Sequence, residues 1–131
     1  MSDLLEQARA REWFYRYELP DGTVLPCTHD AGIQAIHDTR WQMLDACLDQ
    51  RLGPDRGELT ALDLASHQGW FALQMARAGF GSVLGIDARR SHVEDAGLIA
   101  GLFGEDQLSF RQQDIHAMDT QALGQFDVVL M

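Results

Sequence analysis

The chain has 131 residues, of which 46% are hydrophobic and 23% charged, a composition typical of one globular domain with its own core. Its net charge of −10 argues against broad electrostatic binding to nucleic acid, because such binding needs clustered lysine and arginine. A local basic patch, or an RNA held by another part of a longer protein, stays open.

Two further features bear on the cellular location. Cys27 and Cys47 lack metal-ligand spacing and form no CxxC pair, which favours free thiols in a reducing compartment. The N-terminus has no basic stretch followed by an apolar one, and no apolar run reaches membrane-spanning length. We therefore expect a cytoplasmic protein with no membrane partner.

Residues 1–57 are expected to form a helical and extended N-terminal extension. The pattern predicts a helix over residues 2–12, an extended aromatic segment over 13–19 and a turn at 20–22. A longer helix follows near residues 30–52. The sequence GPDRG at 53–57 stops that helix and forms the clearest linker.

Residues 58–131 change to an alternating pattern. Short apolar strands are predicted at 59–65, 82–88, 108–114 and 126–131, with helices over 68–78 and 91–100 between the first three. Ser91 and Glu94 have the spacing of a capping box for the second helix. This alternation predicts right-handed βαβ units, and so an α/β fold with a parallel sheet. Because the fourth strand runs to Met131, we expect these residues to be a truncated piece of a longer protein.

Three acidic residues fall at or near the ends of successive strands, namely Asp63, Asp87 and Asp114. Ligands of open α/β sheets bind outside the carboxyl ends of the strands, so three acids in this position outline a cleft. Asp87 is placed to accept hydrogen bonds from two ribose hydroxyls, although a capping or surface aspartate is the alternative. Asp114, followed by Ile115, could face a purine, or could be a simple turn residue.

The loop at residues 65–69 joins the first strand to its helix. Its small residues would let backbone N–H groups approach a ligand near the helix N-terminus. Asp63 lies beneath this loop, and a buried carboxylate is costly without donors. Either it serves only to hold the loop, or it also binds a ligand's ammonium group.

The stretches LDLASHQG, GIDAR, RQQDI and FDVVLM resemble the successive motifs of class I S-adenosylmethionine-dependent methyltransferases. The resemblance covers about residues 58–131 and implies a Rossmann-like sheet of order 3-2-1-4. It implies cofactor contacts at Asp63, Ala65, Ser66, His67, Gly69, Asp87, Ala88, Asp114 and Ile115. Ala65 and His67 depart from the family pattern, because glycine is common at both positions.

The resemblance implies methyl transfer from S-adenosylmethionine to a nucleophile, with this fragment supplying the cofactor site; it identifies no catalytic base. The segment WFYRYELPDGT at 13–23 and the helix containing Arg40 and Trp41 are similar to methyltransferases grouped with tRNA wobble-uridine modification enzymes. The methyl acceptor, a small molecule or a tRNA, stays open.

Two other functions compete with this one. An NAD-type dinucleotide-binding domain would share Asp87 but would need the G-x-G-x-x-G fingerprint, of which this loop offers only Gly69. A non-catalytic interaction module would fit the substitutions Ala65 and His67.

We expect no metal site, because the five histidines form no HExxH or similar pattern. An open fourth-strand edge would pair with another copy or be covered by the N-terminal helices.

Overall fold

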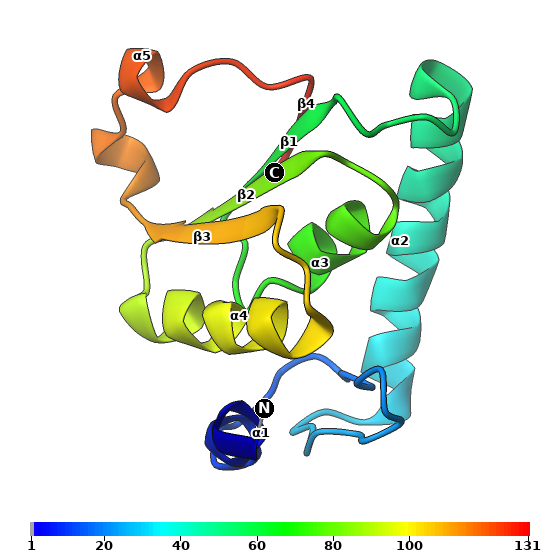
Figure 1. Cartoon of the computed structure of the whole chain (residues 1–131), viewed down its shortest axis with the longest axis vertical. Helices are drawn as coiled ribbons and strands as arrows, with labels where there is room; N and C mark the ends of the chain where they lie inside the picture. The colour runs from blue at the N-terminus through cyan, green and yellow to red at the C-terminus, as the bar shows by residue number, and fades with distance from the viewer. Residues whose placement is uncertain (1) are drawn as a thin grey trace.

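A four-stranded parallel sheet lies at the centre of the computed structural model, which describes residues 2–131 (Figure 1). Its strands are β1 (Thr60–Leu64), β2 (Ser82–Asp87), β3 (Leu108–Gln112) and β4 (Val128–Leu130). The spatial order is β3-β2-β1-β4, and every neighbouring pair is parallel. The predicted α/β fold and the predicted strand order are confirmed.

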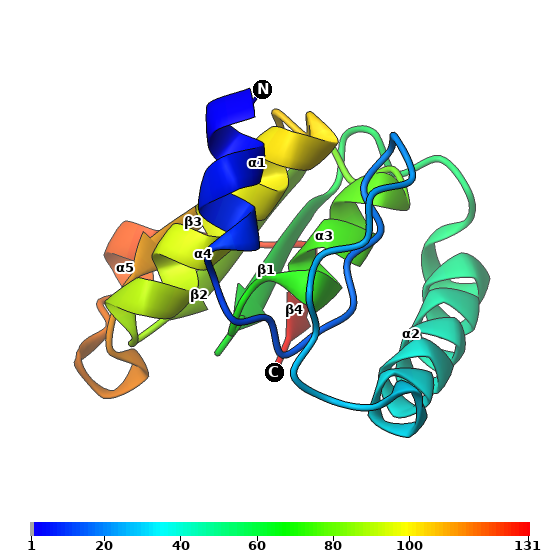
Figure 2. The same cartoon turned by 90° about the horizontal axis from the view of Figure 1, so that it is seen from below.

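Helices cover one face of this sheet. Figure 1 shows α3 (Trp70–Arg77) and α4 (Arg90–Phe103) on the same side of the strands. Figure 2 shows α1 (Ser2–Arg9) lying against α4, and α2 (Ala31–Leu52) beside α3. On the other side of the sheet run a short 3-10 helix, η1 (Ile115–Ala117), and α5 (Thr120–Leu123). No helix within residues 2–131 has the length and hydrophobicity needed to cross a membrane.

One hydrophobic core joins the N-terminal extension to the sheet. Along the aromatic segment, Trp13, Tyr15 and Tyr17 are buried while Arg16 is exposed, as the alternating sequence predicts. These rings belong to the same cluster as buried residues of α3, β2 and α4. The indole N–H of Trp13 also donates to the carbonyl of Ala8 at 2.7 Å. The extension is therefore packed into the domain core.

Several predicted helices were longer than the observed ones. The first helix ends at Arg9, and α3 begins at Trp70 because the loop before it holds three left-handed residues. The predicted capping box of α4 is wrong. The helix begins one residue before Ser91, and its N-cap residue, Arg89, makes no side-chain cap bond. Glu94 instead accepts a hydrogen bond from the Arg90 guanidinium at 2.9 Å.

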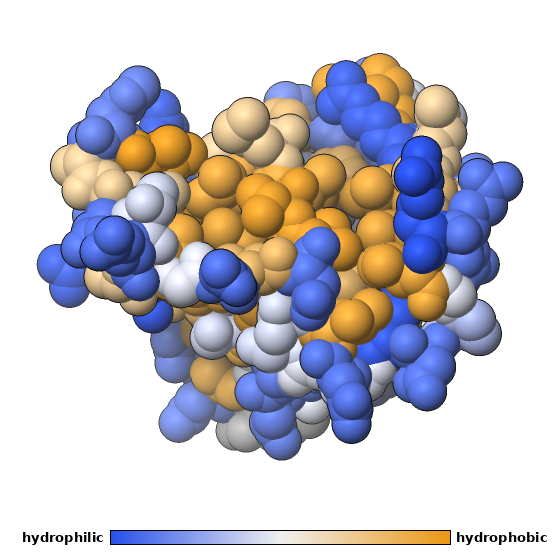
Figure 3. All heavy atoms as spheres, turned by 90° about the horizontal axis from the view of Figure 1, so that it is seen from above, coloured by the Kyte–Doolittle hydropathy of each residue, from blue (hydrophilic) through white to orange (hydrophobic). Residues whose placement is uncertain are grey.

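The face of the sheet opposite α3 and α4 carries an apolar surface. Seen from above, Figure 3 shows apolar atoms spread across its middle, between hydrophilic atoms at the rims. In and after β4, Val129 is 56% exposed and Met131 is 91% exposed. β4 pairs only with β1 and is an edge strand. Pairing of this edge with a second copy stays a prediction, which sedimentation of the purified chain would test.

Candidate functional site

Asp63 and Asp87 lie at the carboxyl ends of two paired central strands. Asp63 is the fourth residue of β1 and Asp87 the last of β2. Both are buried, at 5% and 8% exposed. The negative charge of Asp87 helps to raise the pKa of Asp63, so the two carboxylates are electrostatic neighbours. The sequence prediction that strand ends gather acids in one place is confirmed for this pair.

The Asp87 carboxylate is held by donors from the protein. Its Oδ2 accepts the backbone N–H of His67 at 2.9 Å, and its Oδ1 accepts that of Arg89, also at 2.9 Å. The His92 ring nitrogen Nδ1 lies 3.2 Å from Oδ1. Through these contacts Asp87 ties the loop at 65–69 to the end of β2 and to the start of α4.

Asp63 has a contrasting environment. Burial is the largest cause that raises its pKa from 3.8 to about 7, and the charge of Asp87 adds to the rise. The backbone N–H of Ala72 opposes it; this N–H lies in the first turn of α3, where helix N–H groups lack partners within the helix. None of the ion pairs of residues 2–131 includes Asp63. A cationic ligand group would therefore stabilise its ionised form.

The loop over these aspartates has an unusual backbone. Ala65 and His67 adopt left-handed conformations, with φ of 59° and 53°, and Gly69 has φ of 87°. Such values favour glycine, because a Cβ crowds the backbone there. At Gly69 an added Cβ would also approach the Phe110 ring within 2.6 Å. Ala65 and His67 thus keep the backbone that glycine would give, at some cost in strain.

His67 lies beside Asp87. Its ring stacks on that of His92 with centroids 3.9 Å apart, and it lies 5.1 Å from the Phe14 ring. Burial lowers the pKa of His67 to about 4, and the neighbouring His92 adds to the decrease. Its Nδ1 atom is buried without a hydrogen-bond partner, as is the Oγ of Ser66 in the same loop. Both atoms are unsatisfied polar groups beside Asp87 or Asp63.

A cavity of about 440 Å³ opens next to Asp63. Its walls combine the loop residues Ala65 and Ser66 with apolar side chains of α2, α3 and β4. Two residues of the N-terminal part, Tyr15 and Arg40, also line it. Sequence reasoning did not place either in the site, because no local pattern shows that residues 48 and 23 positions before Asp63 reach the end of β1.

The remaining predicted residues lie at the rim. β3 ends at Gln112, so Asp114 follows the strand instead of ending it; its carboxylate is exposed and accepts the backbone N–H of His116 at 2.9 Å, capping η1. Ile115 is 37% exposed, and Ala88 is exposed after β2. The structure does not bring these three into the buried part of the cleft.

Within residues 2–131, no group of three histidine, cysteine, aspartate or glutamate side chains is arranged to hold a metal ion. The polar groups of the cleft are instead suited to an organic ligand. Asp87 can accept hydroxyl donors, Asp63 can pair with an ammonium, and Arg40 supplies a positive charge to the wall of the same cavity.

Comparisons with known proteins agree with this geometry. Residues 55–131 match the sequence profile described as "Methyltransferase domain". A search of curated protein sequences finds no match. Among solved structures, the N-terminal domain of EvdMO1 with SAH bound is similar at a TM-score of 0.73 and 18% identity, over 98% of this chain and 52% of that one.

Two other solved structures share the fold. Magnesium protoporphyrin IX methyltransferase (ChlM) from Synechocystis PCC 6803 with bound SAH has a TM-score of 0.60 and 24% identity, over 74% of this chain and 42% of that one. The YcgJ protein from Bacillus subtilis has a TM-score of 0.56 and 21% identity, over 64% and 33%. This chain thus spans about a third to a half of the length of these three structures.

Proposed function

The chain belongs to the methyltransferase-domain family, and on this premise we propose that it binds S-adenosylmethionine and that the protein transfers the cofactor's methyl group to a nucleophile. The observation that carries this proposal is the pair of buried aspartates at the ends of β1 and β2. Asp87 is a preformed hydrogen-bond acceptor, and Asp63 is a buried carboxylate without an ion-pair partner. A ligand with ribose hydroxyls at one end and an ammonium at the other complements both.

We assign each end of the cofactor to one acid. Asp87 would accept hydrogen bonds from the ribose hydroxyls, with the loop at 65–69 beside it. Asp63 would pair with the α-ammonium, and Arg40 in the same cavity with the α-carboxylate. Asp114 and Ile115, with Ala88, would border the adenine at the rim. The unsatisfied Ser66 Oγ is a further hydrogen-bonding group for this ligand.

The cofactor supplies an activated methyl group on its sulfonium sulfur, so the bond from methyl to nucleophile forms as the bond to sulfur breaks. The residues of this chain would bind and orient that ligand, and the apolar walls of the cavity would exclude water from it. The catalytic base stays unidentified. We propose that the acceptor is a small molecule or a tRNA; the net charge of −10 favours the small molecule. The free thiols of Cys27 and Cys47 support a cytoplasmic location.

Calorimetric titration of the purified chain with S-adenosylhomocysteine tests this function, with NAD as the control ligand. We expect saturable binding of the first and none of the second. Binding of NAD would favour the dinucleotide-binding alternative. Binding of neither would overturn cofactor binding by this chain and favour the interaction module, in which strained Ala65 and His67 would mark a loop that no longer holds a ligand.

A further inference from the structure

The segment of residues 12–17 lies between α1 and the rest of the N-terminal extension, and its Tyr15 lines the cavity beside Asp63. Figure 2 shows the chain crossing between α1 and α2 in this region. It forms no regular strand; its one ladder contact is an isolated bridge between Trp13 and Cys27. The carbonyls of Trp13 and Tyr17 accept backbone N–H groups of Thr28 and Leu25, and side-chain contacts fix the rest of the segment's path.

Gln68, in the loop at 65–69, makes three hydrogen bonds to this segment, and the Gln34 side chain makes a fourth by accepting the backbone N–H of Arg16 at 2.8 Å. The side-chain oxygen of Gln68 accepts the backbone N–H of Phe14 at 2.8 Å, and its amide nitrogen donates to the carbonyl of Glu12 at 2.8 Å. Its own backbone carbonyl accepts the Tyr17 hydroxyl at 2.9 Å. The three bonds of Gln68 join two parts of the chain that are more than 50 residues apart in sequence.

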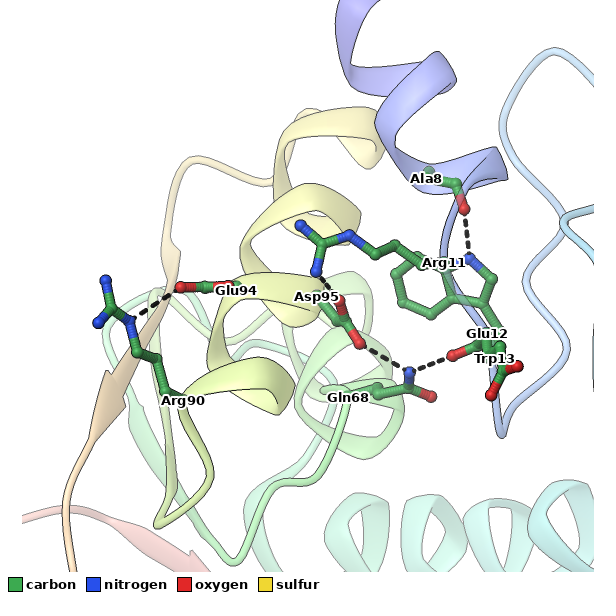
Figure 4. Close-up of polar contacts among 8 residues, drawn as sticks. All are labelled: Ala8, Arg11, Glu12, Trp13, Gln68, Arg90, Glu94 and Asp95. Carbon is green, nitrogen blue, oxygen red and sulfur yellow. Dashed lines mark hydrogen bonds and ion pairs between the residues drawn. The ribbon is translucent and has the colours of Figure 1, made fainter.

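A charged pair completes the arrangement, as Figure 4 shows. The second bond of the Gln68 amide nitrogen goes to Oδ2 of Asp95 in α4 at 3.0 Å, and Oδ1 of Asp95 lies 3.1 Å from the Arg11 guanidinium. Gln68 is 4% exposed and Asp95 is 7% exposed. The Gln68 amide supplies both a donor and an acceptor from one side chain. Glutamate would lose both donated bonds and place a second carboxylate against Asp95.

The path that Gln68 fixes brings Tyr15 to the cavity beside Asp63. The Tyr15 ring stacks on Trp70 at 5.9 Å and 13°, and it lies 5.4 Å from the His67 ring. Burial raises the pKa of Tyr15 to about 12, and the charge of Asp63 is the next largest cause. The hydroxyl therefore stays protonated and can donate a hydrogen bond within the cavity.

We propose that Gln68 is a positioning residue: it fastens residues 12–17 to the cofactor loop, so that Tyr15 walls the methionine end of the cofactor site. This inference rests on the proposed function, because it assigns the cavity beside Asp63 to that end of the ligand. We therefore expect a Gln68 variant to lose affinity for one end of the ligand and to keep affinity for the other. Groups bound at the Asp87 end should keep their affinity, whereas groups bound beside Tyr15 should lose it.

Two ligands separate the two ends: S-adenosylhomocysteine reaches both, and adenosine lacks the amino-acid end. In Q68A we expect affinity for S-adenosylhomocysteine to fall at least tenfold, and affinity for adenosine to change less than twofold. The control is E94Q, which removes an exposed ion pair of α4 without touching residues 12–17. It should leave both affinities unchanged. Trypsin should also cleave faster after Arg16 in Q68A than in E94Q.

The other outcomes are distinct. If wild-type protein does not bind S-adenosylhomocysteine, the proposed function fails and this assignment fails with it. If wild-type protein binds but Q68A keeps its affinity, or loses affinity for both ligands equally, only the positioning role is overturned. Should Q68A not fold, Y15L decides, because it removes the ring and keeps an apolar side chain. Selective loss of S-adenosylhomocysteine in Y15L supports the role, and unchanged binding overturns it.

Discussion

Asp63 and Asp87 are alike in sequence context and unlike in physical state. Each is an aspartate at the end of a buried parallel strand, and each is less than a tenth exposed. Asp87 accepts two backbone N–H groups and contacts a histidine, whereas the pKa of Asp63 is raised to about 7. The loop and α4 N-terminus satisfy one acid, and the other is left facing a cavity.

This difference implies that the two aspartates would contribute to ligand binding in different ways. Asp87 already accepts hydrogen bonds from the loop and from Arg89, so the proposed ligand would add hydrogen bonds to a site that is already formed. Asp63 bears a cost in the free protein, because burying a carboxylate near a second one disfavours its ionised form. Binding of an ammonium would relieve that cost. The stability of the free domain and its affinity for the ligand are thus coupled through Asp63.

The largest expected effect comes from removing the acid that the loop depends on. D87A leaves the N–H groups of His67 and Arg89 without their acceptor, so we expect the free energy of unfolding to fall by about 3 kcal/mol. Affinity for S-adenosylhomocysteine should fall at least a hundredfold. Chemical denaturation and calorimetry measure the two effects. D106N, an exposed aspartate outside the cleft, controls for the change in charge. Unchanged binding in D87A would remove Asp87 from the site.

Substitution of Asp63 should change the stability of the domain in the opposite direction. A pKa raised from 3.8 to about 7 corresponds to about 4 kcal/mol for ionising Asp63 in the folded protein. A buried neutral amide retains roughly 2 kcal/mol of burial cost, so D63N should stabilise the domain by about 2 kcal/mol at pH 8. It should weaken S-adenosylhomocysteine binding about tenfold. A D63N protein that is both less stable and weaker in binding would contradict the contrast drawn between Asp63 and Asp87.

Stability should also depend on pH through Asp63. The unfolded chain releases this proton near pH 4, and the folded protein holds it until about pH 7, so over that range the unfolded state binds fewer protons. The contribution of Asp63 to stability therefore falls as pH rises from about 4 to 7, and it stays constant above. Comparing wild-type and D63N unfolding at a series of pH values isolates this contribution. A constant difference between them would show that the pKa of Asp63 is not raised.

Ligand affinity should change with pH in the other direction. In the proposed binding mode the ammonium pairs with ionised Asp63, so affinity for S-adenosylhomocysteine should rise severalfold between about pH 5.5 and 8, and D63N should lose that rise. His67, whose pKa is lowered to about 4, stays neutral over this range and does not add to the change. Titrations of both proteins in matched buffers measure it. A rise that persists in D63N would point to another titrating group.

The smallest effect concerns the loop between the two acids. Ala65 is exposed and has φ of 59°, a conformation that glycine adopts without strain. A65G should therefore raise the free energy of unfolding by about 1 kcal/mol. A76G, in the interior of α3, is the contrasting variant and should lower it by about 1 kcal/mol or more. Destabilisation by A65G would mean that the Cβ of Ala65 makes a contact that outweighs the strain.

Much of the fold followed from local pattern. The alternation of apolar strands and helices predicts the parallel sheet, and its order is confirmed. The aspartates at the ends of β1 and β2 were predicted because strand ends meet at one edge of such a sheet. Boundaries were less accurate: the capping box at Ser91 was wrong because the helix begins earlier, at Arg90. Asp114 falls beyond its strand for a similar reason, since the chain turns into η1.

The order of elements, the family and the acids at the strand ends could be read from the amino-acid sequence, because these depend on residues close together in the chain. The packing of distant segments gives Asp87 several hydrogen bonds and leaves Asp63 with a raised pKa, since these states depend on Arg89, His92 and the buried surroundings. The same holds for Tyr15 at the cavity and for the bonds of Gln68 to residues 12–17. Contacts between segments more than 50 residues apart leave no local pattern, because their geometry exists only after the core has formed.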